Sequence, residues 1–382
     1  MSGQTSSDPL VRLLADLVAI PSVNPMGRGK SGPGYSEQDV AAYVAAYLRR
    51  HGVETTVSDV LAGRPNVTGF IDAGAEQTLL LEAHSDTVQA ESMTIPPFTP
   101  ELRDGRLYGR GACDTKGSLA AFLHGVCSLL DGGGRLRFNV IVLAAADEEY
   151  QFTGARHAVA HGLKADFGIV GEPTRLAIVR AHKGVTRWRI ATRGVAAHSA
   201  YPERGENAIY AMAHVLGRLE EYGKTLRGST PHPFLGSPSL SAGVIEGGQA
   251  VNVVPDRCTV EVDRRTLPGE SAEEVLSAAG RALAGVPGWE FEPPHVTVGA
   301  MEVPEGSPLL RLLSGAIAGV CGEARVEAAQ YATDAGLFNG AGIPSVVFGP
   351  GDIAQAHTSE EWIDLENLHT AAAIVRGLIS RQ

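Results

Sequence analysis

Apolar residues recur at helical spacing near the start of the chain and predict two amphipathic helices. The first begins at Asp8 and Pro9, which are typical of an N-cap and a first helical position. The second is expected to begin at Ser36, with Asp39 as its capping-box partner, and to end at Gly52. Each helix would bury its apolar face against a core.

Short, continuous apolar runs follow these helices and predict buried strands. They cover residues 78–83, 138–146, 167–170 and 345–348. A helical stretch at residues 117–130 separates the first two runs. Strands that alternate with helices in this way predict an α/β domain whose central sheet lies between helices.

The middle of the chain has a different order of elements. Strands are predicted at 186–192, 240–245, 258–264 and near 295–298, and helices at 207–222 and 272–284. This β-α-β-β-α-β order is ferredoxin-like and indicates an α+β domain. A chain of 382 residues is also long enough for two domains. We therefore expect residues 1–180 and 299–382 to form the α/β domain, with residues 181–298 inserted between its halves.

Composition narrows the classes of partner and location. The chain has 43 acidic and 32 basic residues and a net charge of -11, which argues against a nucleic-acid partner. No apolar run is long enough to span a bilayer, and the first ten residues lack the features of a signal peptide. The four cysteines are far apart, without a CxxC pair, as is typical of reduced proteins. We expect a cytoplasmic protein without a membrane partner.

Ionisable residues gather where the predicted strands end. In strand order these residues are His84 and Asp86, then Asp147-Glu148-Glu149, then Glu172, and after a Gly-Pro-Gly loop His357. Because ligands bind at the carboxyl edge of open α/β sheets, we expect them to converge there with Asp114, which lies in a loop. One histidine or one glutamate pair would be an ordinary surface feature, but the joint pattern indicates a metal site. Nitrogen and oxygen ligands without thiolates suit Zn²⁺, with Co²⁺ or Mn²⁺ as substitutes.

Five motifs that contain these residues resemble one known family over nearly the whole chain. The motifs are His84-Ser85-Asp86, Gly111 to Gly117, Asp147-Glu148-Glu149, Gly171-Glu172-Pro173-Thr174 and Ala356-His357-Thr358. In this order they resemble the co-catalytic zinc aminoacylase/carboxypeptidase family. That family includes acetylornithine deacetylase, succinyl-diaminopimelate desuccinylase and bacterial glutamate carboxypeptidase. Any one motif would be a weak signal, whereas the five together are specific.

The resemblance implies two divalent metal ions per subunit and a division of their ligands. Asp114 would bridge the two metals. The remaining ligands would be His84 and Glu172 on one metal, and Glu149 and His357 on the other. Asp86 would orient the His84 ring. Glu148 would be the general base that takes a proton from the attacking water and passes it to the leaving amine.

The resemblance also implies functional residues in the inserted domain, which would be a lid and a dimerisation domain. His198 is similar to the family's oxyanion donor, which reaches the active site of the partner subunit in a homodimer. Arg265 is similar to the arginine that clamps the substrate α-carboxylate, although strand register leaves Arg264 as the alternative. Asn252 and Thr333 are further candidates for polar contacts with the substrate.

The expected activity is hydrolysis of the amide bond of a small N-acyl amino acid. The nearest likeness is to acetylornithine deacetylase or succinyl-diaminopimelate desuccinylase, and the alternative is a carboxypeptidase or dipeptidase of the same family. A binding protein that had lost catalysis would have lost a metal ligand or the base. All six positions are filled here, so we expect an enzyme.

Overall fold

The computed structural model describes residues 6–381, which divide into two compact units. The first unit takes in the described parts of Met1–Arg180, Val303–Glu327 and Thr333–Gln382. The second unit comprises Ala181–Glu302 and Ala328–Ala332, so it extends slightly beyond the boundary expected at residue 298. Within residues 6–381, no helix combines the length and apolar character needed to cross a membrane.

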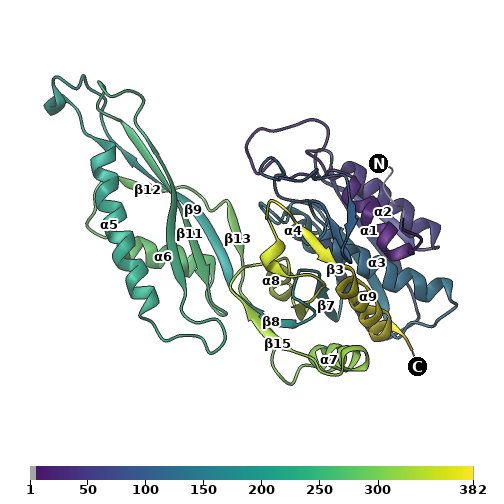
Figure 1. Cartoon of the computed structure of the whole chain (residues 1–382). Coiled ribbons are helices and arrows are strands. Elements are labelled where there is room, and N and C mark those ends of the chain that lie inside the picture. The colour runs from purple at the N-terminus through teal and green to yellow at the C-terminus, as the bar shows by residue number, and fades with distance from the viewer. Residues whose placement is uncertain (1–5, 382) are drawn as a thin grey trace. The chain divides into compact units, whose positions relative to one another are not determined.

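A mixed nine-stranded sheet runs through the first unit in the order β1-β2-β6-β3-β7-β16-β8-β14, with β15 also paired to β8 (Figure 1). Its strands are β1 Glu54–Leu61, β2 Arg64–Ile71, β3 Thr78–His84, β6 Asn139–Ala145, β7 Phe167–Val170, β8 Ile178–His182, β14 Met301–Glu302, β15 Val326–Ala329 and β16 Ser345–Val347. The sequence analysis did not predict the antiparallel strands β1 and β2.

The four predicted strands β6, β3, β7 and β16 are neighbours in this sheet and run parallel. Almost every residue of β3, β6 and β7 is buried, so helices cover both faces of the sheet there. Because parallel strands end at the same edge, the residues that follow them meet at one place. The prediction of a central parallel sheet with a common carboxyl edge is confirmed.

Helices surround this sheet. They are α1 Pro9–Ala19, α2 Gln38–Arg50, α3 Lys116–Asp131, α4 Thr153–Ala160, α7 Pro308–Cys321, α8 Ala335–Gly340 and α9 Leu365–Ile379, with the short 3₁₀ helix η2 Ile353–Gln355. Asp8 caps α1 by accepting from the backbone N–H groups of Leu10 and Val11, as predicted. The predicted capping box of the second helix is wrong. Glu37 is the N-cap residue, and the Ser36 hydroxyl donates to the carbonyl oxygen of Gly63.

A small three-stranded sheet in the order β17-β5-β4 lies beside the loop that carries Asp114. Its strands are β4 Glu101–Arg103, β5 Arg106–Tyr108 and β17 Trp362–Asp364. Trp362 pairs with Tyr108 in this sheet. This pairing brings the residue before β17, Glu361, close to the residues after β5.

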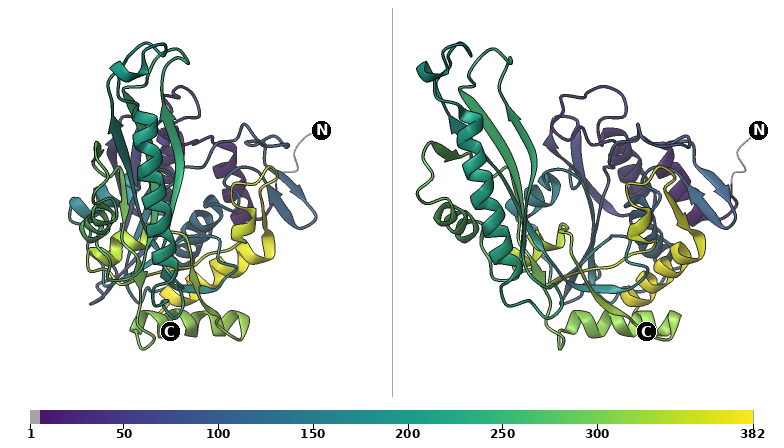
Figure 2. Two further views of the ribbon diagram at one scale, coloured as in Figure 1. Left: turned by 90° about the vertical axis from the view of Figure 1, so that its left-hand side faces the viewer. Right: turned by 60° about the vertical axis from the view of Figure 1, so that its left-hand side comes forward.

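The second unit has the predicted β-α-β-β-α-β order, with an antiparallel sheet in the order β10-β11-β9-β12. Its elements are β9 Gly184–Arg193, η1 Pro202–Arg204, α5 Ala208–Arg227, β10 Ser239–Gly247, β11 Arg257–Thr266, α6 Ala272–Ala282, β12 Trp289–Phe291 and β13 Val296–Val298. The last predicted strand is two short ones, β12 and β13, which both pair with β9. The long teal helix α5 runs beside the strands (Figure 2).

One face of this second sheet is covered and the other is not. Alternate residues of β11, from Cys258 to Val262, pack with Trp188 of β9 and with residues of α5 and α6 in a buried core. Since side chains alternate along a strand, Asp263 and Arg265 lie on the opposite face, whereas Arg264 lies on the helix-covered face. Arg264 is accordingly only 1% exposed.

Candidate active site

Asp114 lies between two histidines at the carboxyl edge of the first unit's sheet. One carboxylate oxygen of Asp114 is 3.2 Å from Nε2 of His84, at the end of β3. The other is 3.3 Å from Nε2 of His357. An aspartate that reaches two imidazoles through its two oxygens has the arrangement needed to bridge two metal ions.

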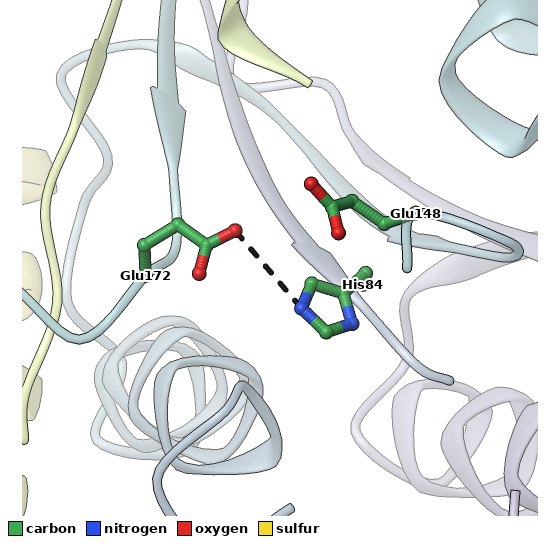
Figure 3. Close-up of side chains that lie close together, drawn as sticks. All are labelled: His84, Glu148 and Glu172. Atoms are coloured by element: carbon green, nitrogen blue, oxygen red, sulfur yellow. Dashed lines mark ion pairs between the residues drawn. The ribbon is translucent and has the colours of Figure 1, made fainter. Parts of the chain in front are cut away.

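Two further glutamates complete the pair of ligand groups. Glu149 Oε2 is 3.3 Å from Nε2 of His357, and Glu172 Oε1, after β7, is 4.0 Å from Nε2 of His84 (Figure 3). Potential ligand atoms of His84, Glu148 and Glu172 lie within 4.8 Å of one another, as do those of His84, Asp114 and Glu149. The structure therefore brings together all five predicted metal ligands and the predicted base.

The charges of this cluster fit divalent cations. Burial raises the pKa of Glu148 and of Glu172 well above the usual range, with further contributions from neighbouring carboxylates. Hydrogen bonds to Asp114 and Glu149 raise the pKa of His357 to about 10. Glu149 Oε1 is buried and has no hydrogen-bond partner. Several carboxylates in a buried site, one with an unsatisfied oxygen, require positive charge, and two metal ions would supply it.

Asp86 connects the His84 ring to the backbone of the glutamate pair. Its backbone oxygen is 3.0 Å from His84 Nδ1, and its carboxylate lies 3.6 Å from the same nitrogen. The carboxylate also accepts from the backbone N–H groups of Glu148 and Glu149. With Nδ1 held in this way, Nε2 of His84 is directed at Asp114 and Glu172.

The sequence of the whole chain matches a known family. The family described as Peptidase family M20/M25/M40 matches residues 80–381. An acetylornithine deacetylase of Photorhabdus laumondii is 31% identical over 383 residues, which cover 97% of this chain and 96% of that protein. The chain belongs to the M20/M25/M40 peptidase family.

Other relatives agree with this family. An acetylornithine deacetylase of Myxococcus xanthus is 36% identical over 309 residues, or 78% of each protein. The structure of an M20 family metallo-carboxypeptidase, Sso-CP2 from Sulfolobus solfataricus, has a TM-score of 0.80 at 22% identity and covers 97% of this chain and 98% of that chain. Aminopeptidase PepT from Bacillus cereus has a TM-score of 0.76 at 21% identity, with 99% of each chain covered. At these identities the solved structures show a shared fold.

The family assignment confirms the resemblance that the five motifs indicated. As a member of the M20/M25/M40 peptidase family, the chain is a metal-dependent hydrolase that acts on amide bonds. The ligand cluster at the sheet edge is the candidate site for the metals.

The other predicted site residues of this M20/M25/M40 member lie apart from the metal cluster in sequence and in environment. His198, Asn252 and Arg265 belong to the second unit, and His198 and Asn252 are exposed. Thr333 belongs to the first unit and is 1% exposed, and its hydroxyl accepts from the backbone N–H of Ala335 at the start of α8. Thr333 thus has a local structural role.

A buried polar network that the sequence analysis missed supports Asp86 and the Glu148 turn. Asn24 donates to Asp86 at 2.7 Å and to Asp147 at 3.0 Å through its side-chain amide. Arg64 donates to the other side of Asp147 at 2.8 Å and to Glu37 in a bidentate pair. Burial raises the pKa of Glu37 to about 7, although Arg64 opposes this shift. These residues come from distant segments and have no local sequence signature.

A second missed residue, Glu361, holds the loop of the bridging aspartate. Its fully buried carboxylate accepts from the backbone N–H groups of Gly111, Cys113 and Asp114. Arg110 donates to the same carboxylate at 2.7 Å. Three backbone donors and a guanidinium on one carboxylate fix the path of the loop, and with it the position of Asp114.

Proposed function

We propose that the chain hydrolyses the amide bond of a small N-acyl-L-amino acid and that it binds two Zn²⁺ ions for this purpose. The observation that carries the proposal is the position of Asp114, which reaches His84 and His357 through different oxygens. The curated relatives named acetylornithine deacetylase, at 31% and 36% identity, point to an N-acyl amino acid as the substrate.

The proposed ligand division follows the geometry of the cluster. Glu172 and His84 would hold one metal, Glu149 and His357 the other, and Asp114 both. When bound, such ions lower the pKa of a coordinated water toward about 7 and polarise the substrate carbonyl. A set of imidazole and carboxylate ligands without thiolates suits Zn²⁺, and Co²⁺ or Mn²⁺ would substitute for it.

Glu148 is the proposed general base. Its carboxylate faces the same group of ligand atoms as His84 and Glu172, and it lies directly after the turn that Asp86 holds (Figure 3). There it would accept a proton from the attacking water and deliver that proton to the departing amine nitrogen. Nearby cations would lower its pKa from the raised value that burial gives, so that it accepts protons at neutral pH.

His198 is the proposed donor to the oxyanion, acting on the partner subunit of a homodimer. Its Nδ1 accepts from the backbone N–H of Ala200 at 3.0 Å, which places the ring proton of a neutral imidazole on Nε2. The exposed ring can therefore offer an N–H to a developing negative charge. The backbone N–H of Ser199 donates to the carbonyl oxygen of Asn252, so the two predicted contact residues are neighbours.

The second unit supports the proposed homodimer. β10 is an edge strand of its sheet, and edge strands present unpaired backbone groups to other chains. Val244 and Ile245 on this strand are 52% and 53% exposed, and Tyr210 of α5 is 72% exposed. A second copy of the same surface would bury these side chains across a twofold axis.

Arg265 is the proposed clamp for the substrate α-carboxylate. The alternative, Arg264, is buried on the helix-covered face, where it pairs with Glu270 at 2.5 Å. Arg265 lies on the uncovered face and pairs with Asp263 at 2.8 Å. Burial, together with the charges of both arginines, lowers the pKa of Lys183. A substrate carboxylate would find a locally cationic environment at this face.

A substrate panel tests the proposed function. The metal-free protein, prepared with chelator, would be assayed before and after addition of Zn²⁺ or Co²⁺ with N-acetyl, N-succinyl and N-formyl amino acids and with dipeptides. We expect activity to return with metal and to be highest on an N-acyl amino acid. Highest activity on dipeptides would favour the alternative function, a carboxypeptidase or dipeptidase. Unchanged activity after complete metal removal would contradict the proposed metal site.

The proposed location is the cytoplasm, which rests on the cysteines. Cys113, Cys127, Cys258 and Cys321 are free, and the first three are buried. Free, buried thiols suit a reducing compartment.

A further inference from the structure

A cavity lined by three arginines lies at the amino-terminal edge of the parallel strands, away from the metal ligands. Its volume is about 540 Å³. Arg137 precedes β6, Arg311 belongs to α7, and Arg381 follows α9, and all three line the cavity. The seven residues of β6 separate Arg137 from the Glu148 turn by about 23 Å, at about 3.3 Å per residue. The cavity is therefore distinct from the active site.

The arginines of this cavity are not paired with carboxylates. Among residues 6–381, no Asp or Glu oxygen lies within ion-pair distance of Arg137, Arg311 or Arg381. Arg311 donates to the backbone oxygen of Gly306, and the Arg137 guanidinium lies 5.4 Å from the ring centroid of Phe138. In a chain of net charge -11, this is a local excess of positive charge without an internal counter-ion.

The backbone adds a fourth arginine to the group. Leu136 forms an antiparallel bridge with Ser380. The backbone N–H of Arg381 donates to the oxygen of Arg135 at 2.8 Å, so these two residues face each other across the bridge. Like charges placed directly opposite are destabilising, and a bound anion would remove that repulsion.

A neighbouring cavity of about 510 Å³ shows the usual balance of charge. It is lined by Arg12 and Arg50, and also by Asp16 and Asp131. Cations and carboxylates face the same space there, so no external anion is required. The absence of lining carboxylates distinguishes the cavity with Arg137 from this one.

We propose that the cavity lined by Arg137, Arg311 and Arg381 binds a small organic anion with two or more phosphate or carboxylate groups. Guanidinium groups bind both kinds of anion in bidentate pairs. Leu312, Ala316 and Leu378 supply an apolar wall for a carbon skeleton. The volume lies within the range of small-molecule sites, which is larger than a single inorganic ion needs.

Calorimetric titration of the metal-loaded protein with two probes tests this site. Fructose 1,6-bisphosphate represents phosphates, tricarballylate represents polycarboxylates, and acetate at equal ionic strength is the monovalent control. We expect saturable binding of at least one polyvalent probe and none of acetate. Binding of one probe alone identifies the chemical group that the site prefers. Absence of saturation with both probes would overturn the proposal.

Variants assign the binding to this cavity. The triple variant Arg137→Gln/Arg311→Gln/Arg381→Gln should bind the probe about tenfold more weakly or worse, because its charge-assisted hydrogen bonds are lost. The matched control Arg12→Gln/Arg50→Gln, in the balanced cavity, should bind as the unaltered protein does. If the triple variant does not fold, Arg311→Gln on α7 and its conservative partner Arg311→Lys replace it, with stronger binding expected for Lys. Equal affinity in the cavity variants and the control would contradict the assignment.

Discussion

The two units of the chain hold their predicted functional residues in opposite ways. In the first unit, His84 and Asp114 are 2% and 7% exposed, and hydrogen bonds from several elements fix them. In the second unit, His198 and Arg265 lie on strands and loops with open faces, and His198 contacts only its own loop. The metal site is complete within one unit of one chain, whereas the residues of the second unit have partners only near themselves. A buried cluster of this kind is organised by folding, and an exposed one by substrate and by a second subunit.

The sharpest test within the metal cluster separates Glu148 from Glu149. Glu148→Ala should retain both metals and lose about 10²- to 10⁴-fold in kcat, because a base is removed and a ligand is not. Glu149→Ala should lose metal, because its Oε2 faces His357. Metal content by elemental analysis, measured beside kcat, checks both. Metal loss in Glu148→Ala with retention in Glu149→Ala would exchange the two roles.

The second unit is tested by mixing two inactive variants. His198→Ala lacks the proposed oxyanion donor, and Glu148→Ala lacks the proposed base. If His198 serves the partner subunit, a mixed dimer contains one complete site, on the His198→Ala chain. With random exchange at equal amounts, half of the dimers are mixed, so about a quarter of the unaltered activity should return. Activity that stays at the mutant level, with exchange shown independently, would show that His198 does not act across subunits.

Arg265 is tested by the charge of the substrate. Arg265→Ala should lower kcat/KM about 10- to 100-fold for a substrate with a free α-carboxylate, and much less for its amide, because a charge-assisted pair is worth about 1.5–3 kcal/mol. Arg187→Ala is the matched control, since Arg187 pairs with the same Asp263 at 2.8 Å. An equal loss for acid and amide substrates would exclude the carboxylate clamp.

Sequence pattern predicted the parallel strands and their terminal residues because both leave local signals. Four apolar runs and the ionisable residues after them were enough to place His84 and Glu172 at one edge of the sheet. The start of α2 was predicted wrongly because Glu37 is drawn into the core by Arg64, which lies 27 residues away. Glu361 and Arg110 are 251 residues apart, and their pairing likewise has no local pattern. Contacts that hold the site were therefore the part that sequence alone could not supply.

Asn24 offers the mildest test of the first unit, because it touches none of the proposed ligands. Its amide links Asp86 to Asp147, so Asn24→Ala should leave both carboxylates with one fewer donor. We expect about 1–3 kcal/mol lower stability and about tenfold weaker metal binding, the usual range for a residue that supports a ligand.

Asn139→Ala is the matched control for Asn24→Ala. Asn139 begins β6 at the other edge of the sheet, where it accepts from the backbone N–H groups of Ala73 and Ala75. Its loss should lower stability without changing the affinity for Zn²⁺, measured by competition with a chelator of known affinity. If both variants weaken metal binding equally, the effect follows from general destabilisation. A loss of affinity confined to Asn24→Ala would show that the network under Asp86 sets the geometry of the metal site.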